Sequence, residues 1–130
     1  MTTFTLDGTA VRDIPSLYAE LDRVLMPDEE WTLGASLDAL DDLLYGGFGQ
    51  LATAEPPVRI VWTNAAASRG ALGRAATIAY YREKVARPDV FDAKRFTRLL
   101  AEAEAGRGPI YFDLVLDVFA AHPEIDLRLA

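Results

Sequence analysis

The first part of the chain has a strand pattern followed by a helix pattern. Residues 3–6 alternate polar and apolar side chains, and the Asp-Gly pair at residues 7–8 is typical of a turn. Apolar residues then recur at helical spacing over residues 15–25, and Asp13 is suited to capping the start of this helix. Pro27 cannot continue a helix, so the pattern predicts a short strand and then an amphipathic helix that ends before this proline.

The middle of the chain predicts a second helix, a loop and a buried strand. Residues 37–45 have the helical pattern, with Ser36 as a favourable N-cap and two glycines at 46–47 as a natural stop. Residues 50–57 have no regular pattern and are predicted to form a loop. Residues 58–62 form an apolar run rich in β-branched side chains, which is typical of a buried strand, and we expect the tryptophan at its end in the core.

The last half of the chain is predominantly helical. Helices are predicted over residues 65–86, 91–105 and 110–121, and Asn64 is suited to capping the first of them. Residues 125–129 alternate apolar and charged side chains and are predicted to form a terminal strand. Three basic residues near the end of the first of these helices are typical of a solvated helix face: Arg82, Lys84 and Arg87.

Length and composition place these elements in one domain. The chain has 130 residues, of which 51% are hydrophobic, and a chain of this length buries about two-thirds of its surface without a covalent staple. It has no cysteine, which excludes disulfides and thiolate metal sites. Long helical segments between strands favour parallel pairing. We therefore predict a single α/β domain over residues 1–130, with a small three-stranded parallel sheet flanked by helices.

The net charge of −7 comes from one segment. No lysine or arginine lies between Arg23 and Arg59, whereas this stretch contains seven of the 20 acidic residues, and the remaining 13 equal the basic residues in number. A field of a single sign attracts basic proteins and repels nucleic acid. The charge pattern therefore predicts a basic protein partner and no nucleic-acid partner.

Nothing in the sequence predicts export or a membrane span. Residues 1–4 lack the basic and apolar runs of a secretion signal. No stretch approaches the roughly 18 apolar residues that a membrane helix needs. We expect a cytoplasmic protein without a membrane partner.

The predicted helix over residues 37–45 separates leucines from aspartates. Leucines at 37, 40 and 44 share one face, whereas Asp38, Asp41 and Asp42 project from the other. Asp38 and Asp42 lie four residues apart and repel each other by about 0.2–0.5 kcal/mol, with no lysine or arginine on the helix to relieve them. A role in binding explains this arrangement better than helix stability does.

An enzyme is the less favoured interpretation of the same residues. Three aspartates can hold a metal ion for phosphoryl transfer, but such sites usually add a base or a phosphate clamp, and residues 24–58 supply neither. His122, the only histidine, precedes Pro123 and is predicted to mark a helix end, where the helix dipole favours it. The glycines around Phe48 follow a helix, so they do not form a phosphate loop. We predict no catalytic activity, no cofactor and no metal site.

Three segments, in this order, resemble the barstar family of ribonuclease inhibitors. They are Leu-Asp-Gly at 6–8, Gly-Ala-Ser-Leu-Asp-Ala-Leu-Asp-Asp-Leu-Leu at 34–44 closing on the glycines at 46–47, and Val-Arg-Ile-Val-Trp at 58–62. The family's hallmark is a Gly-x-Asn-Leu-Asp-Ala-Leu-x-Asp run, in which this chain has serine for asparagine. Residues 112–119 and the strand after them resemble the family's last helix and strand.

The resemblance covers residues 4–62 and 110–129, and residues 66–108 look like an enlarged helical insertion. It implies a three-stranded parallel sheet flanked by helices. It also implies tight inhibition of a small secreted ribonuclease while that enzyme is still inside the producing cell. The partner would then be a basic ribonuclease or a similar basic nuclease or toxin, and the free protein would be a monomer. The alternative is a non-inhibitory interaction module that binds another basic protein or toxin domain.

The same resemblance assigns residues to the contact. The family's two helix aspartates fall on Asp38 and Asp42, and its acidic residue on the final helix falls on Asp117, with Glu102 as the second choice. In the family these carboxylates meet the basic side chains that bind phosphate in the nuclease. They would therefore act as phosphate mimics.

The chain also departs from the family at three aromatic positions. Aromatic contacts of the family fall on Asp41 and Thr32, and the aromatic after the helix-ending glycine becomes Gly47. Interfaces depend on a few aromatic or arginine anchors, and the residues that can replace the missing ones are Trp31, Tyr45 and Phe48. The predicted partner-binding residues are Asp38, Asp41, Asp42, Asp117, Trp31, Thr32, Tyr45 and Gly46.

Overall fold

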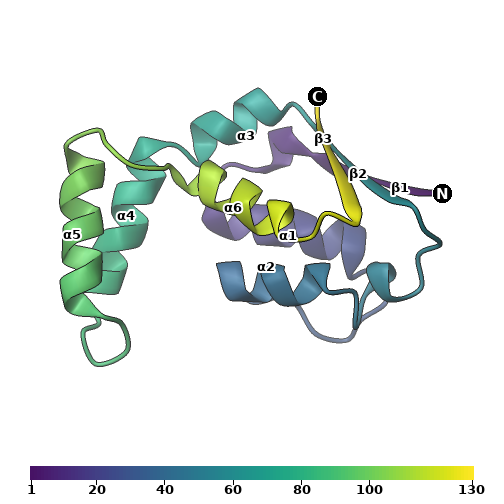
Figure 1. Ribbon diagram of the computed structural model, residues 1–130, viewed down its shortest axis with the longest axis horizontal. Coiled ribbons are helices and arrows are strands. Elements are labelled where there is room, and N and C mark those ends of the chain that lie inside the picture. Colours follow the sequence, from purple (N-terminus) through teal and green to yellow (C-terminus); the bar gives the residue numbers. More distant parts are fainter.

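A computed structural model describes residues 1–130 as a parallel sheet covered by helices (Figure 1). Two single-turn helices, Gly8–Ala10 and Gln50–Ala52, accompany the main elements. In chain order the main elements are β1 (Thr2–Asp7), α1 (Ile14–Leu25), α2 (Leu37–Leu44), β2 (Val58–Thr63), α3 (Ala65–Ala71), α4 (Arg74–Val85), α5 (Ala93–Glu104), α6 (Tyr111–Ala120) and β3 (Ile125–Leu129). No helix is long and apolar enough to cross a membrane.

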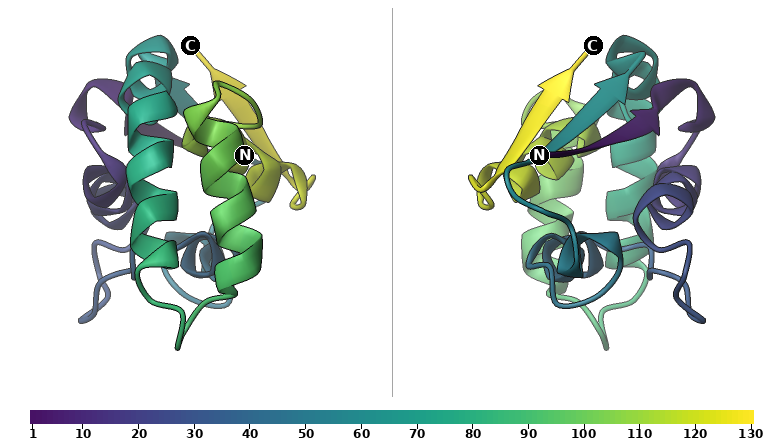
Figure 2. Two further views of the ribbon diagram at one scale, coloured as in Figure 1. Left: turned by 90° about the vertical axis from the view of Figure 1, so that its left-hand side faces the viewer. Right: turned by 90° about the vertical axis from the view of Figure 1, so that its right-hand side faces the viewer.

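The sheet has the order β1-β2-β3, and both strand pairs are parallel. The predicted three-stranded parallel sheet is therefore confirmed. Its helices lie on one face, and Figure 2 (right) shows the strands in front of them. Parallel sheets usually have both faces covered. Here the face without helices is exposed to solvent and carries polar side chains. Among them, Asp126 accepts hydrogen bonds from Arg59 and Arg128, each at 2.9 Å.

The core lies between the covered sheet face and the helices. Trp62 of β2 is fully buried, as the sequence predicts, and its ring centroid lies 5.2 Å from that of Phe112 on α6. The indole Nε1–H donates to the Ser68 hydroxyl at 2.9 Å, and this hydroxyl donates to the carbonyl of Gly8 at 2.9 Å. The only polar side-chain atom of Trp62 thereby has a hydrogen-bond partner, so burying the indole carries little penalty.

The prediction of one helix over residues 65–86 is wrong. The helix is interrupted at Leu72 and Gly73, where Leu72 turns into the core with no exposed surface and the backbone of Gly73 is extended. Asn64 precedes α3 with a positive φ of 51°, and its side chain makes no capping hydrogen bond, so the predicted cap is also wrong. Burial of Leu72 and the two glycines beside it, Gly70 and Gly73, therefore divide the predicted helix in two.

The interruption sends α4 away from the sheet, where it packs against α5 (Figure 2, left). Tyr111 fixes this helical pair to the rest of the fold. Its backbone N–H donates to Thr77 Oγ1 at 2.8 Å, its ring packs edge-on to Tyr80 at 5.0 Å, and its hydroxyl lies 2.8 Å from that of Tyr18. The α4–α5 pair is therefore held in a defined position beside α1 and α6.

Candidate functional site: the acidic face of α2

Helix α2 begins at the predicted residue, Leu37, and ends one residue before the predicted end. The Ser36 hydroxyl accepts a hydrogen bond from the Ala39 N–H at 3.0 Å, which satisfies one free donor of the first turn. Gly46 has a φ of 80°, a conformation that glycine adopts without strain, and its N–H donates to the Leu43 carbonyl. The helix buries three leucines in the core: Leu40, Leu43 and Leu44.

Burial of the leucines directs Asp38 and Asp42 outward. Both side chains are exposed, and no basic nitrogen lies within 4.0 Å of either carboxylate. Neither carboxylate has a hydrogen-bond partner in the protein. Asp38 does act on its surroundings: the pKa of Tyr80 is raised by burial first and then by the nearby charges of Tyr81 and Asp38. The two aspartates are therefore two negative charges without ion-pair partners, one helical turn apart.

Asp41 differs from its two neighbours because it is bound within the protein. His122 Nε2–H donates to Asp41 Oδ1 at 2.6 Å, and only 3% of the imidazole is exposed, against 40% of the aspartate side chain. The other ring nitrogen lies 3.4 Å from Glu124 Oε1. The Tyr45 ring stands edge-on to the imidazole, with centroids 4.7 Å apart. His122 thus ties α2 to the end of α6.

His122 lies directly after the C-terminal cap of α6, so its predicted position at a helix end is confirmed. Its contact with Asp41 joins residues 81 positions apart, and sequence reasoning missed this role. The signal available in advance was weak. A lone histidine before a proline indicates a helix end, but not the surface against which that end packs.

Two acids of the same segment also have internal roles. Glu29 accepts a hydrogen bond from the Gly49 N–H at 3.0 Å, and Asp28 accepts one from Gln50 Nε2 at 2.9 Å. These bonds hold the loop before α2 against the loop after it. Fewer acidic side chains are therefore free to meet a partner than the charge count implies, and Asp38 and Asp42 are among those that are free.

The aromatic residues predicted for the contact surround this pair in the chain. Tyr45 is 74% exposed at the end of α2, and Trp31 is 48% exposed in the preceding loop. Trp31 rests against Phe48, with ring centroids 4.9 Å apart, so these two side chains support each other. Thr32 is exposed beside Trp31. Single exposed apolar side chains are common on protein surfaces, so the exposure of these rings makes them accessible to a partner but does not by itself indicate one.

The position of the third predicted carboxylate is clear, but its role stays a prediction. Asp117 is exposed on α6, the helix that packs against α2, whereas Glu102 lies on α5 in the outer helical pair. Asp117 is therefore the better placed of the two. The structure contains no group of three histidine, aspartate or glutamate side chains that could hold a metal ion.

Fold and site together define an acidic α/β protein whose exposed helix is suited to a basic protein surface. A family model described as barstar, barnase inhibitor, matches residues 1–97, which include the sheet strands β1 and β2 and the whole of α2. This chain belongs to the barstar family. The match ends within α5, before α6 and β3. No curated protein matches the chain.

Proposed function

We propose that this protein inhibits a ribonuclease with a basic active site, and that the acidic face of α2 enters that site. The proposal depends mainly on Asp38 and Asp42, which are exposed and unpaired on a helix without a basic residue. Membership of the barstar family, described as barnase inhibitors, supports the inhibitor class.

The proposed mechanism is phosphate mimicry. An ionised carboxylate accepts hydrogen bonds from arginine and lysine much as a phosphate oxygen does. Four helical residues rise about 6 Å along the axis, so Asp38 and Asp42 can meet two neighbouring cations of the nuclease. The RNA phosphate is then excluded from its site, and inhibition needs no chemical step.

The surrounding residues would add contact area and specificity. Tyr45 at the end of α2 and Trp31 on Phe48 offer exposed aromatic surface, and aromatic anchors contribute strongly to interfaces. Thr32 and Gly46 would lie beneath the partner next to these rings, and Asp117 would supply a third carboxylate from α6. Asp41 would contribute less than its neighbours, because His122 already occupies one of its oxygens.

We propose that the protein acts as a monomer in the cytoplasm, where it holds a basic nuclease or toxin domain inactive. The alternative is an interaction module that binds such a partner without blocking it. The two differ in whether RNA cleavage stops once a complex has formed.

The test measures RNA cleavage by barnase, the nuclease named in the family description, with increasing amounts of the protein. We expect cleavage to stop, and Asp42→Asn and Asp38→Asn each to weaken binding about tenfold or more. Glu30→Gln is the matched control, because Glu30 is exposed in the same acidic segment and has no side-chain partner. It should change binding less than about threefold, the effect of a rim charge.

Each outcome distinguishes between the inhibitor, the non-inhibitory module and a contact made elsewhere on the protein. A complex that still cleaves RNA would favour the non-inhibitory module. Equal small effects of Asp42→Asn and Glu30→Gln would show that α2 is not the contact. Full cleavage without a complex would exclude barnase as the target.

A further inference from the structure

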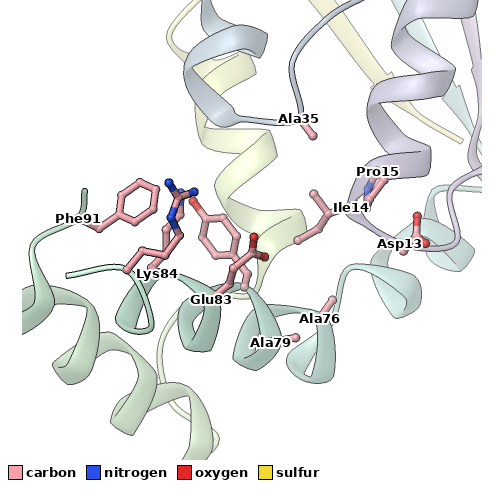
Figure 3. Close-up of a pocket in the computed structure, with 11 residues that line it drawn as sticks. Asp13, Ile14, Pro15, Ala35, Ala76, Ala79, Glu83, Lys84 and Phe91 are labelled. Carbon is pink, nitrogen blue, oxygen red and sulfur yellow. The ribbon is translucent and has the colours of Figure 1, made fainter. Parts of the chain in front are cut away.

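A hollow lies between α4 and the start of α1, and the acidic face of α2 does not use it. It is a cleft of about 460 Å³ between α4, the start of α1 and Ala35, the residue before the α2 cap (Figure 3). Its floor is apolar and is formed mainly by Ile14, Pro15, Ala76 and Ala79. A concavity of this volume is on the scale of pockets that hold small ligands, whereas protein interfaces are broader and flatter.

One end of the cleft carries two cations that rest on aromatic rings. Lys84 Nζ lies 3.8 Å from the centroid of Phe91 and 5.1 Å from that of Tyr80, and Arg87 Cζ lies 5.7 Å from Phe91. No carboxylate oxygen lies within 4.0 Å of either cation, whereas Arg82 of α4 is paired with an acid. Arg82 and Arg87 are exposed, as the predicted solvated face requires, whereas Lys84 is partly buried.

The two acids of the cleft are arranged differently. Asp13 lies at the opposite end from Phe91 (Figure 3), and its carboxylate accepts the Ser16 N–H at 2.8 Å as the cap of α1. Glu83 lies on α4 between the two ends and has no ion-pair partner. The cleft is thus polarised: positive charge without an ion-pair partner lies at the Phe91 end and hydrogen-bonded negative charge at the Asp13 end, with the unpaired Glu83 carboxylate between them.

We propose that this cleft binds a small organic acid, with its carboxylate on Lys84 and Arg87 and its apolar body on the floor at Ile14 and Ala76. The ring contacts hold the two cations at the edge of the cleft, so less conformational entropy is lost when a ligand binds. Aliphatic or aromatic bodies fit the floor because it offers no polar side chain. The cleft borders the acidic face, since Ala35 and Tyr80 line it and the Asp38 charge acts on Tyr80. Its ligand, however, has the opposite charge from the proposed protein partner of α2 and binds at the far end, on Lys84 and Arg87.

The probe for the test is 3-phenylpropionate, added to the ¹⁵N-labelled full-length protein and followed by amide chemical shifts. We expect saturable shifts around residues 14, 76–87 and 91, with a Kd on the order of 1 mM for a ligand of this size. The neutral 3-phenylpropanamide should bind about tenfold more weakly, because it gains no charge-assisted bonds.

Three variants test the assignment of charges. Lys84→Met with Arg87→Gln should weaken the binding of 3-phenylpropionate about tenfold or more, whereas Lys94→Met with Arg98→Gln removes the same charge from the exposed face of α5 and should leave it unchanged. Glu83→Gln should tighten it about threefold, because it removes a like charge beside the ligand.

The absence of saturable shifts up to about 20 mM would overturn the proposal, and so would equal binding of the acid and the amide. A loss of binding that is equal in both charge-deletion variants would reduce the effect to general electrostatics and would also overturn it. The probe is measured on the free protein, so failure here leaves the ribonuclease test unaffected.

Discussion

The junction between α2 and α6 provides the sharpest test of how this site is built. Replacing His122 with alanine removes the 2.6 Å hydrogen bond to Asp41 and the edge-on contact with Tyr45. It also leaves a small void, since only 3% of the imidazole is exposed. We expect both lower stability of the fold and a less ordered Tyr45 at the end of the acidic helix.

The size of the effect follows from these contacts. A hydrogen bond to a charged group contributes about 1.5–3 kcal/mol, and the lower figure applies because 40% of the Asp41 side chain can regain water. The lost ring packing and the void add about 1 kcal/mol. The total of about 2.5 kcal/mol corresponds to a fall in Tm of about 9 °C, at about 2.1 cal/mol/K of unfolding entropy per residue.

The assay is urea and thermal unfolding of a double-mutant cycle with His122→Ala and Asp41→Ala. Asp41→Ala should also cost about 1–3 kcal/mol, because it leaves a buried imidazole N–H without an acceptor. The coupling energy between the two changes should be about 1 kcal/mol. His122→Gln keeps a donor and should recover part of the loss. A coupling energy near zero would refute the idea that this bond fastens α2 to α6.

Three further predictions concern other parts of the molecule. The pKa of Glu20 is lowered, first by the hydrogen bond from Arg23, so its stabilising effect is present above the ordinary value of 4.5 and is lost as pH falls through the lowered one. Urea unfolding from pH 7 to pH 3 should show this loss, and Glu20→Gln should reduce it. Ser68→Ala should cost about 2 kcal/mol in urea unfolding, because Trp62 Nε1–H and the Gly8 carbonyl both lose their partner. A milder cost would mean that water replaces the hydroxyl. Association with a basic nuclease should slow as salt rises in stopped-flow measurements, and a salt-independent on-rate would argue against electrostatic steering.

Local sequence patterns predict most elements of this fold, because each of these elements is determined by residues close to it in the chain. The strand predicted over 58–62 extends over Val58–Thr63, and the terminal strand has the predicted bounds of 125–129. Helix α2 ends one residue earlier than predicted. In each case an apolar run, a cap or a glycine acts within a few residues, so the sequence carries the whole signal.

The predictions from sequence fail where the structure depends on contacts between residues that are distant in the chain. The interruption after α3 combines a local signal, the glycines at 70 and 73, with the burial of Leu72 in the core, and only the second needs the tertiary arrangement. The bond between Asp41 and His122 and the cleft between α1 and α4 likewise need the tertiary arrangement. Charge counts located the acidic segment, but only the structure separates Asp28, which binds a neighbouring loop, from Asp42, which binds nothing in the protein.

The state of Asp41 bears on what partner the proposed inhibitor can accept. By resemblance this position carries an aromatic contact in the barstar family, and here it carries a carboxylate bonded to His122. A third free aspartate would add repulsion to Asp38 and Asp42, and its bond to the imidazole offsets that cost. The same imidazole supports the Tyr45 ring, which is the nearest exposed aromatic surface on α2. Under the proposed function, the aromatic contact that the family makes at the position of Asp41 is therefore replaced here by Tyr45, one turn further along the chain. A nuclease that fits this protein must then present its complementary pocket at Tyr45.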